Sequence, residues 1–286
     1  MSDHDPTIDL VAPGHGADIT PLAPPSDHHG HTQTLDERLL GMRLSGLALD
    51  MVDLLDRTLH DRSGDIRRWA AEPAVRACLS GRPTSATAIR EVARIIADRA
   101  FYLDLWIIDA QGRVVATGRP ARSSTRIGVD ASGEPWFRDA LGLGPGGSVI
   151  SDIAAIPGCG NAATLAFAAA IGGSDPTEPA HGVIALFFDW HGQTTPLLHH
   201  ARQRGGGAGV RCLLLNPRQQ VMADTDATGR CAHPGPVTPG LAACGWYKDA
   251  NDIVIGYARC PNHQNGAGQG WIGIVARRAT RNSHIH

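Results

Sequence analysis

The chain has 286 residues, which is long enough for one large domain or two small domains with a buried core. A formal net charge of −2 leaves no basic footprint for nucleic acid or for an anionic membrane surface. Apolar runs such as GVIALFF are far shorter than the ~20 residues of a membrane span, and the first ten residues lack a signal-peptide pattern. We therefore expect a soluble, cytoplasmic protein with no membrane span and with reduced cysteines.

A long helix is predicted after an N-terminal tail. Residues 1–34 contain proline, glycine, aspartate and histidine without apolar periodicity, which indicates a disordered tail. From Leu40 to Trp69 apolar residues recur at steps of three or four, which predicts one helix over 39–71. Thr34 and Glu37 have the spacing of a capping box at its start. At ~1.5 Å per residue such a helix spans roughly 50 Å, so it should cross more than one folded unit or pair with its own copy.

The next segment changes from helical periodicity to short strands. A second amphipathic helix is predicted over 85–98, and Pro135 indicates the start of another short helix. Strands are predicted at 103–108, 113–117, 148–153, 163–171 and 182–189. Because these strands follow one another in hairpin order rather than alternating with helices, the pattern favours an α+β fold with antiparallel sheets.

The pattern then repeats in a smaller form. The segment 197–209 reads as a helix ending in a glycine run, which is typical of a domain boundary. VRCLLLNPRQQVMADT, which follows it, has the strand, turn and strand design of DLWIIDAQGRVVATG earlier in the chain. Further strands are predicted at 252–259 and 270–277, so two related modules are the simplest interpretation.

The order and spacing of several segments resemble the double Cache ligand-binding sensors of bacterial chemoreceptors and sensor kinases. These segments are DRTLHDRSGDIRRWAAEPAV, LWIIDAQGRVVATG, DASGEPWFRDAL, VISDI, ATLAFAAAI, GVIALFFDW and IGYARCPNHQNGAGQGWIGIVAR. The resemblance covers roughly residues 35–278 and implies a PAS-like module twice over. It implies the following layout: a helical spine and dimer contact at 35–98, a ligand-binding module at 99–204, a smaller module at 205–278 and a tail at 279–286.

The resemblance also implies a function. We expect a sensor of signal transduction or chemotaxis, not an enzyme, that binds a small metabolite in its first module, needs no cofactor and signals by a shift of the long helix. A homodimer through that helix is expected. The membrane-bound relatives have membrane spans and an output domain, neither of which this sequence shows, so we expect a separate signalling protein as a partner or a unit that only binds.

The amino-acid-binding and amine-binding relatives share a clamp that this sequence lacks. Their pattern has an arginine two residues before a tryptophan, a tyrosine directly after it, and an aspartate on the strand that begins Gly-Val. The matching positions here are Glu134, Phe137 and Phe187 around Trp136. A glutamate cannot make a bidentate contact to a carboxylate, which argues against an amino-acid ligand.

The candidate ligand-binding residues each have a structural alternative. Trp136 and Phe137 either line a pocket or cap the sheet as core, and the same choice holds for Trp106 on its strand. Arg126 is a candidate anion contact or a solvated surface residue. The full candidate set is Trp106, Arg126, Glu134, Trp136, Phe137, Ser151, Asp152 and Phe187.

A metal- or haem-dependent redox sensor is the alternative function. The second module contains residue types that bind zinc or iron, namely Cys231, His233, Cys244, Cys260 and His263. Their spacing matches no standard zinc ribbon or finger, and no haem attachment motif is present. No catalytic motif is found either, since the sequence lacks a P-loop, a nucleophile elbow, an HExxH motif and a dinucleotide fingerprint.

Overall fold

The computed structural model describes residues 34–80, 86–120, 126–156, 162–172, 179–226, 243–260 and 270–279. The predicted tails at 1–34 and 279–286 lie outside these residues except for Thr34 and Ala279. Within the described ranges, no helix has both the length and the apolar character that crossing a bilayer requires.

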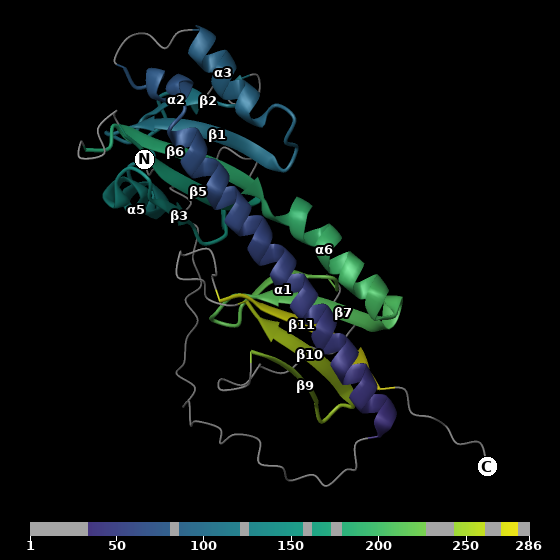
Figure 1. Ribbon diagram of the computed structural model, residues 1–286. Coiled ribbons are helices and arrows are strands. Elements are labelled where there is room, and N and C mark those ends of the chain that lie inside the picture. Colours follow the sequence, from purple (N-terminus) through teal and green to yellow (C-terminus); the bar gives the residue numbers. More distant parts are fainter. Residues whose placement is uncertain are drawn as a thin grey trace, which may run out of the picture. The chain divides into compact units, whose positions relative to one another are not determined.

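Helix α1 (Leu35–Ala70) is the predicted long helix (Figure 1). Its capping box is confirmed, because Glu37 N donates to Thr34 Oγ1 at 3.2 Å and Thr34 N donates to the Glu37 carboxylate at 3.0 Å. The helix ends shortly before Pro73, as predicted, and the chain continues into α2 (Pro73–Ala77) and α3 (Ala86–Ile96).

The first module contains a six-stranded antiparallel sheet, called sheet 1. Its strands are β1 (Tyr102–Asp109), β2 (Val114–Thr117), β3 (Ser148–Ile150), β4 (Ala154–Ala155), β5 (Ala163–Ile171) and β6 (Gly182–Asp189). The order is β2-β1-β6-β5-β3, and β4 also pairs with β5. The strand expected at 148–153 is shorter because the Ser151 hydroxyl, rather than a backbone carbonyl, accepts Ala166 N at 2.9 Å.

Two further helices belong to this part of the chain, one between β2 and β3 and one directly after β6. Helix α5 (Pro135–Leu143) begins at the predicted proline. Helix α6 (Trp190–Gly205) begins seven residues earlier than the 197–209 segment indicates, directly after β6. The Asp189 side chain explains this early start, since it accepts Gly192 N at 2.9 Å and so satisfies an N-terminal donor. A short 3₁₀ turn, η2 (Gly207–Gly209), leads to the second module.

The second module contains a five-stranded antiparallel sheet, called sheet 2. Its strands are β7 (Val210–Leu215), β8 (Val221–Asp224), β9 (Cys244–Lys248), β10 (Ile253–Arg259) and β11 (Ile272–Arg278). The order is β8-β7-β11-β10-β9, which repeats the main path of sheet 1. In both sheets the module's second strand (β2 or β8) lies at one edge and its third strand (β3 or β9) lies at the other. This shared order supports two modules of one design. The edge strand β9 was not predicted.

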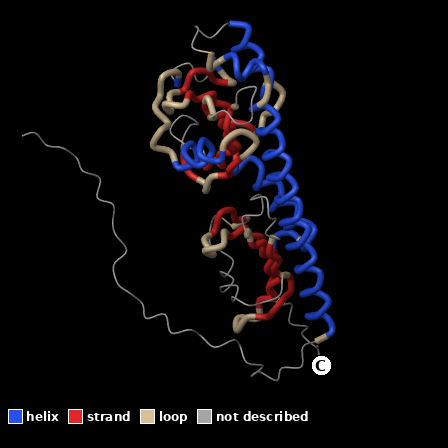
Figure 2. Tube along the Cα trace, turned by 60° about the vertical axis from the view of Figure 1, so that its left-hand side comes forward, coloured by secondary structure: helices blue, strands red, loops and turns tan. Residues whose placement is uncertain are grey.

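Helix α1 packs against both sheets (Figures 1 and 2). Its buried seam follows the predicted spacing. Leu55 belongs to the seam and is 4% exposed, whereas its neighbour Leu54 is 52% exposed. The approach to sheet 2 is close: a Cβ on Gly256 of β10 would overlap the backbone of Leu44. The glycine therefore lets the helix backbone lie directly on the strand.

The apolar core has three parts. The largest cluster joins α1 to the facing sides of both sheets. A second cluster covers the other face of sheet 1, where α5 packs on β5 and β6. A third covers the other face of sheet 2. The predicted α+β class is confirmed, and the residues from Thr34 onward form one compact unit.

Candidate ligand-binding site

Four aromatic side chains meet on the face of sheet 1 turned away from α1, and they define the aromatic site: Trp106, Trp136, Phe137 and Phe187. Strand alternation places Trp106 here, because its neighbours Leu105 and Ile107 belong to the cluster on the α1 side. Phe187 is the centre of the group. Its ring centroid lies 4.5 Å from that of Trp106 and 5.8 Å from that of Trp136, in both cases edge to face.

Small residues on the neighbouring strands make room for these rings. Ala166 and Ala168 of β5 and Ala185 of β6 are buried in the same cluster. Because α5 begins with Pro135 at its first turn, Trp136 and Phe137 enter the cluster from the start of that helix. The site is therefore built from two strands and one helix terminus.

A buried carboxylate holds Trp106 in place. Asp104 precedes Trp106 by two residues on β1, and its Oδ2 accepts the Trp106 Nε1–H at 3.0 Å. The other oxygen accepts Leu105 N at 2.8 Å and Arg119 N at 3.1 Å. Asp104 is not among the residues predicted from the sequence, although its position on the same strand face as Trp106 is a readable signal. The carboxylate fixes both the ring orientation and the end of β2.

Two polar groups around the aromatic site are buried without a hydrogen-bond partner among the described residues. They are the Trp136 Nε1–H and the Thr117 hydroxyl. Thr117 lies opposite Trp106 in the β1–β2 register, so both side chains are on the same face of sheet 1. An unsatisfied buried polar group costs ~1–3 kcal/mol. The described residues leave that cost uncompensated at Trp136.

The other predicted site residues do not join the aromatic cluster. Glu134 is half-buried at the N-cap of α5, where its side chain makes no capping hydrogen bond, and Arg126 is half-buried. The Ser151 hydroxyl is engaged with Ala166 N and Asp152 O at 2.9 and 2.7 Å. Asp152 is exposed and lines a different cavity, together with the turn after β7. The ligand contacts expected of these residues stay predictions.

The predicted metal ligands fall mainly outside the described part of the chain, where Cys231, His233 and His263 lie. Cys244 is exposed at the start of β9, and Cys260 is buried with its Sγ 3.2 Å from Asp56 Oδ1. Burial, and then this hydrogen bond, raise the pKa of the Cys260 thiol, which disfavours the thiolate that binds metals. Among the described residues no cluster of three metal-binding side chains occurs. The zinc, iron or haem alternative stays a prediction.

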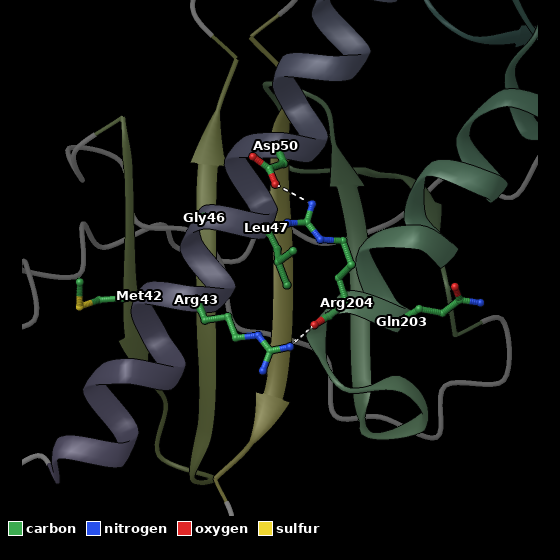
Figure 3. Close-up of a pocket in the computed structure, with 7 residues that line it drawn as sticks. All are labelled: Met42, Arg43, Gly46, Leu47, Asp50, Gln203 and Arg204. Atoms are coloured by element: carbon green, nitrogen blue, oxygen red, sulfur yellow. Dashed lines mark hydrogen bonds and ion pairs between the residues drawn. The ribbon is translucent and has the colours of Figure 1, made fainter.

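A separate groove lies along α1 beside α6, and it is called the α1 groove (Figure 3). It has a volume of about 500 Å³, and Gly46 and Leu47 lie along it. Arg204 of α6 closes one side, where its guanidinium binds Asp50 Oδ2 at 2.9 Å and its carbonyl accepts Arg43 Nη2. These contacts tie the end of α6 to α1.

No protein-family model matches the chain, and no curated protein sequence matches it. Solved structures do match. The ligand-binding domain of the Pseudomonas fluorescens chemoreceptor CtaA, in complex with L-serine, aligns with a TM-score of 0.57 at 14% identity, over 85% of this chain and 99% of that chain. The sensor domain of the Vibrio cholerae histidine kinase DctB aligns with a TM-score of 0.54 at 14% identity, over 84% and 95%.

An extracellular ligand-binding receptor from Desulfohalobium retbaense is also similar, with a TM-score of 0.59 at 11% identity over 83% of this chain. The present chain spans only 40% of that receptor's length. The structural neighbours are thus ligand-binding sensor domains of chemoreceptors and histidine kinases. The chain has their double Cache-like α+β fold, which confirms the predicted fold.

Proposed function

We propose that this protein is a small-molecule sensor that binds its ligand at the aromatic site and has no catalytic role. The observation that carries the proposal is the Trp136 Nε1–H, which is buried without a partner among the described residues in a side chain only 4% exposed. The sensor domains with the same fold support it, since their names state ligand binding.

The chemistry of the site restricts the ligand. Trp106, Trp136 and Phe187 offer ring faces and edges, so the ligand has a flat or apolar part. It also carries an acceptor for the Trp136 Nε1–H and a polar group for the Thr117 hydroxyl. Because Glu134, Phe137 and Phe187 replace the clamp of the amino-acid-binding relatives, we propose a metabolite other than an amino acid.

Signalling is proposed to pass through α1, which contacts both sheets. A ligand can shift this helix only if it binds one arrangement of the helix better than the other. The separate signalling protein and the cytoplasmic location stay predictions from the sequence.

We propose that a second copy of the chain covers one face of α1. Apolar residues at steps of four and three form this face, called the α1 stripe: Leu35, Leu39, Met42, Gly46 and Leu49. The four large members are 37% to 69% exposed. This spacing is the seam of a two-helix coiled coil. Gly46 costs a helix about 1 kcal/mol relative to alanine, and its Cβ would meet nothing within 4 Å, so close approach of a partner helix would explain it.

The ligand proposal is tested by a metabolite screen with thermal unfolding, followed by titration of ¹⁵N-labelled protein. The six tryptophans each give one indole N–H signal, and the Trp136 signal is identified by its loss in Trp136→Phe. A stabilising metabolite should move that signal. Trp136→Phe keeps a ring but removes the donor, so affinity should fall about five- to tenfold, the equivalent of one hydrogen bond. A stabiliser that leaves the Trp136 signal in place, or binds Trp136→Phe equally well, would overturn the assignment.

The dimer proposal is tested by sedimentation of two matched variants. Leu39→Glu places a charge in the α1 stripe, whereas Leu54→Glu places the same charge on an α1 leucine of similar exposure outside it. Leu39→Glu should shift the protein to monomer, and Leu54→Glu should leave the dimer intact. Stable interfaces of ordinary size have dissociation constants below about 100 μM. A wild-type protein that is still monomeric at that concentration would contradict the proposal.

A further inference from the structure

A second cavity lies where the two modules meet, and we call it the junction cavity. It has a volume of about 460 Å³. Asp152, from the segment between β3 and β4 of sheet 1, lines one part of it, and Arg218 and Trp271 of the second module line another. The cavity is separate from the aromatic site in its residues and in the strands that supply them.

Trp271, one of the residues that line the junction cavity, carries a buried donor without a partner among the described residues. Trp271, just before β11, is 3% exposed, and its Nε1–H has no hydrogen-bond partner among the described residues. Its ring is held from behind by Trp190, which stacks on it with centroids 4.8 Å apart and an interplanar angle of 28°. This stacking orients the Trp271 ring, and its donor stays uncompensated among the described residues.

Opposite charges line the same cavity without meeting. Asp152 and Arg218 are both exposed, and neither forms an ion pair with the other or with any other described residue. One carboxylate and one guanidinium, held apart on two modules, complement a molecule that carries both charges itself.

The turn that carries Arg218 is held by hydrogen bonds between its ends. Asn216 binds Gln220 through both side-chain groups, because its Oδ1 accepts Gln220 N at 2.9 Å and its Nδ2 donates to Gln220 Oε1 at 2.7 Å. Two backbone bonds also hold the turn: Asn216 N donates to Gln220 O at 3.0 Å, and Gln219 N donates to Asn216 O at 2.8 Å. A preformed turn lowers the ordering cost of binding.

We propose that the junction cavity is a binding site for a small zwitterion, a molecule with a carboxylate at one end and an ammonium at the other. Its carboxylate accepts hydrogen bonds from Arg218 and from the Trp271 Nε1–H, and its ammonium donates to Asp152. Such a ligand contacts both modules at once, so its binding stabilises their junction. The site is independent of the aromatic site, and either can exist without the other.

The test uses ω-amino acids of increasing length as probes: glycine, β-alanine, γ-aminobutyrate and 5-aminovalerate. Butyrate and butylamine, which each keep only one of the two charges, serve as matched controls. Each compound is titrated into ¹⁵N-labelled full-length protein to about 20 mM, enough to detect millimolar binding. The indole signals of Trp271 and Trp136 are identified by their loss in Trp271→Phe and Trp136→Phe.

At least one zwitterion should move the Trp271 indole signal and leave the Trp136 signal in place. Arg218→Gln and Asp152→Asn, two changes at exposed side chains, should each weaken that binding at least about tenfold, because each removes a charge-assisted contact. Arg278→Gln, an exposed arginine outside the cavity, should change nothing.

Three results would overturn the proposal. The first is that no probe moves the Trp271 signal. The second is that butyrate or butylamine binds as well as the zwitterions, and the third is that Arg218→Gln binds like the wild type. Movement of the Trp136 signal alone would place the probe at the aromatic site, which rejects the junction site while leaving the proposed sensor function standing.

Discussion

Phe187 and Phe188 are consecutive residues of β6 whose rings lie on opposite faces of sheet 1. The Phe187 ring belongs to the aromatic site. The Phe188 ring contacts three aromatic rings of the core on the α1 side at centroid distances of 6.1 to 6.4 Å, those of Phe101, Tyr102 and Phe167. Phe188 also lines a cavity of about 320 Å³ together with Leu55 of α1. One strand thus connects the candidate ligand site to the helix.

The same strand leads onward to the second module. Directly after β6, Trp190 opens α6, and its Nε1–H donates to Met222 O of β8 at 2.8 Å. The stacking of Trp190 on Trp271 adds a contact next to β11. A displacement of β6 at the aromatic site would therefore act on α1 and on sheet 2 together. This contiguity supports the proposed helix shift.

A matched pair of substitutions on β6 separates binding from packing. Phe187→Leu and Phe188→Leu remove the same atoms from two fully buried positions, so each should lower the free energy of unfolding by about 1–2 kcal/mol. Only Phe187→Leu should also weaken ligand binding at the aromatic site, because only that ring contacts Trp106 and Trp136. Urea unfolding and ligand titration of both variants check this. Equal losses of affinity would contradict the assignment of the two faces.

Asp104→Asn should destabilise the protein and release Trp106. Both Asp104 oxygens accept hydrogen bonds from N–H groups. In asparagine an NH₂ group replaces one of these oxygens and faces an N–H donor, which should lower the free energy of unfolding by about 1–3 kcal/mol. The Trp106 indole signal should shift at the same time.

Asp109→Asn is the control for this change. A single Asp109 oxygen accepts both Gln111 N and Arg113 N, at 3.0 and 2.8 Å, and asparagine retains that oxygen. Its free energy of unfolding should stay within about 0.5 kcal/mol of the wild type. If Asp109→Asn proved as destabilising as Asp104→Asn, the orientation of Trp106 by Asp104 would lose its support.

Local pattern was sufficient to predict most of the fold. The spacing of apolar residues in α1, the capping box at Thr34 and the apolar runs of β1 and β6 are properties of short windows, and the structure has each of them. The edge strand β9 escaped prediction because it is short, contains Gly245 and has no fully buried residue, so it carries no alternating signal.

The candidate site was predicted only in its aromatic part. Thr117 joins it through the register of β1 and β2, which a bulge at Ile107 and Ile108 displaces, and such a register cannot be read from one strand alone. Asp152, named in the same candidate set as Trp136, lines the junction cavity with a turn that lies more than 60 residues later in the sequence. Contacts of this kind depend on how the modules pack.

Two glycines of α1 should respond in opposite ways to alanine. A Cβ at Gly41 would overlap the Trp246 ring of β9, whereas a Cβ at Gly64 would meet nothing within 4 Å. Gly64→Ala should therefore raise the free energy of unfolding by up to about 1 kcal/mol, the difference in helix propensity. Gly41→Ala should lower it despite the same gain, because the helix or Trp246 must move. Thermal or urea unfolding of both variants checks the signs, and stabilisation by Gly41→Ala would refute the close packing of α1 on β9.

The contact between Glu37 and Lys248 should make stability depend on pH in the acid range. The Glu37 carboxylate binds Lys248 Nζ at 2.8 Å and so ties the start of α1 to β9. The Lys248 hydrogen bond, and then the backbone N–H of Thr34, lower the pKa of Glu37 from its usual 4.5. A carboxylate whose pKa is lower in the folded state than in the unfolded state stabilises the folded protein. The contribution is complete when the pH is above the unfolded-state pKa, and it is lost as the pH falls through the folded-state pKa.

Glu37→Gln should accordingly lower the free energy of unfolding by ~0.5–1 kcal/mol at neutral pH, the size of a partly exposed ion pair with a capping contact. The difference from the wild type should shrink as the pH falls below 4.5. Glu72→Gln is the control, since that exposed carboxylate makes no capping hydrogen bond at the start of α2 and its loss should matter little at any pH. Urea unfolding at several pH values decides the point, and a difference for Glu37→Gln that stays constant down to acid pH would show that the charge of Glu37 does not contribute.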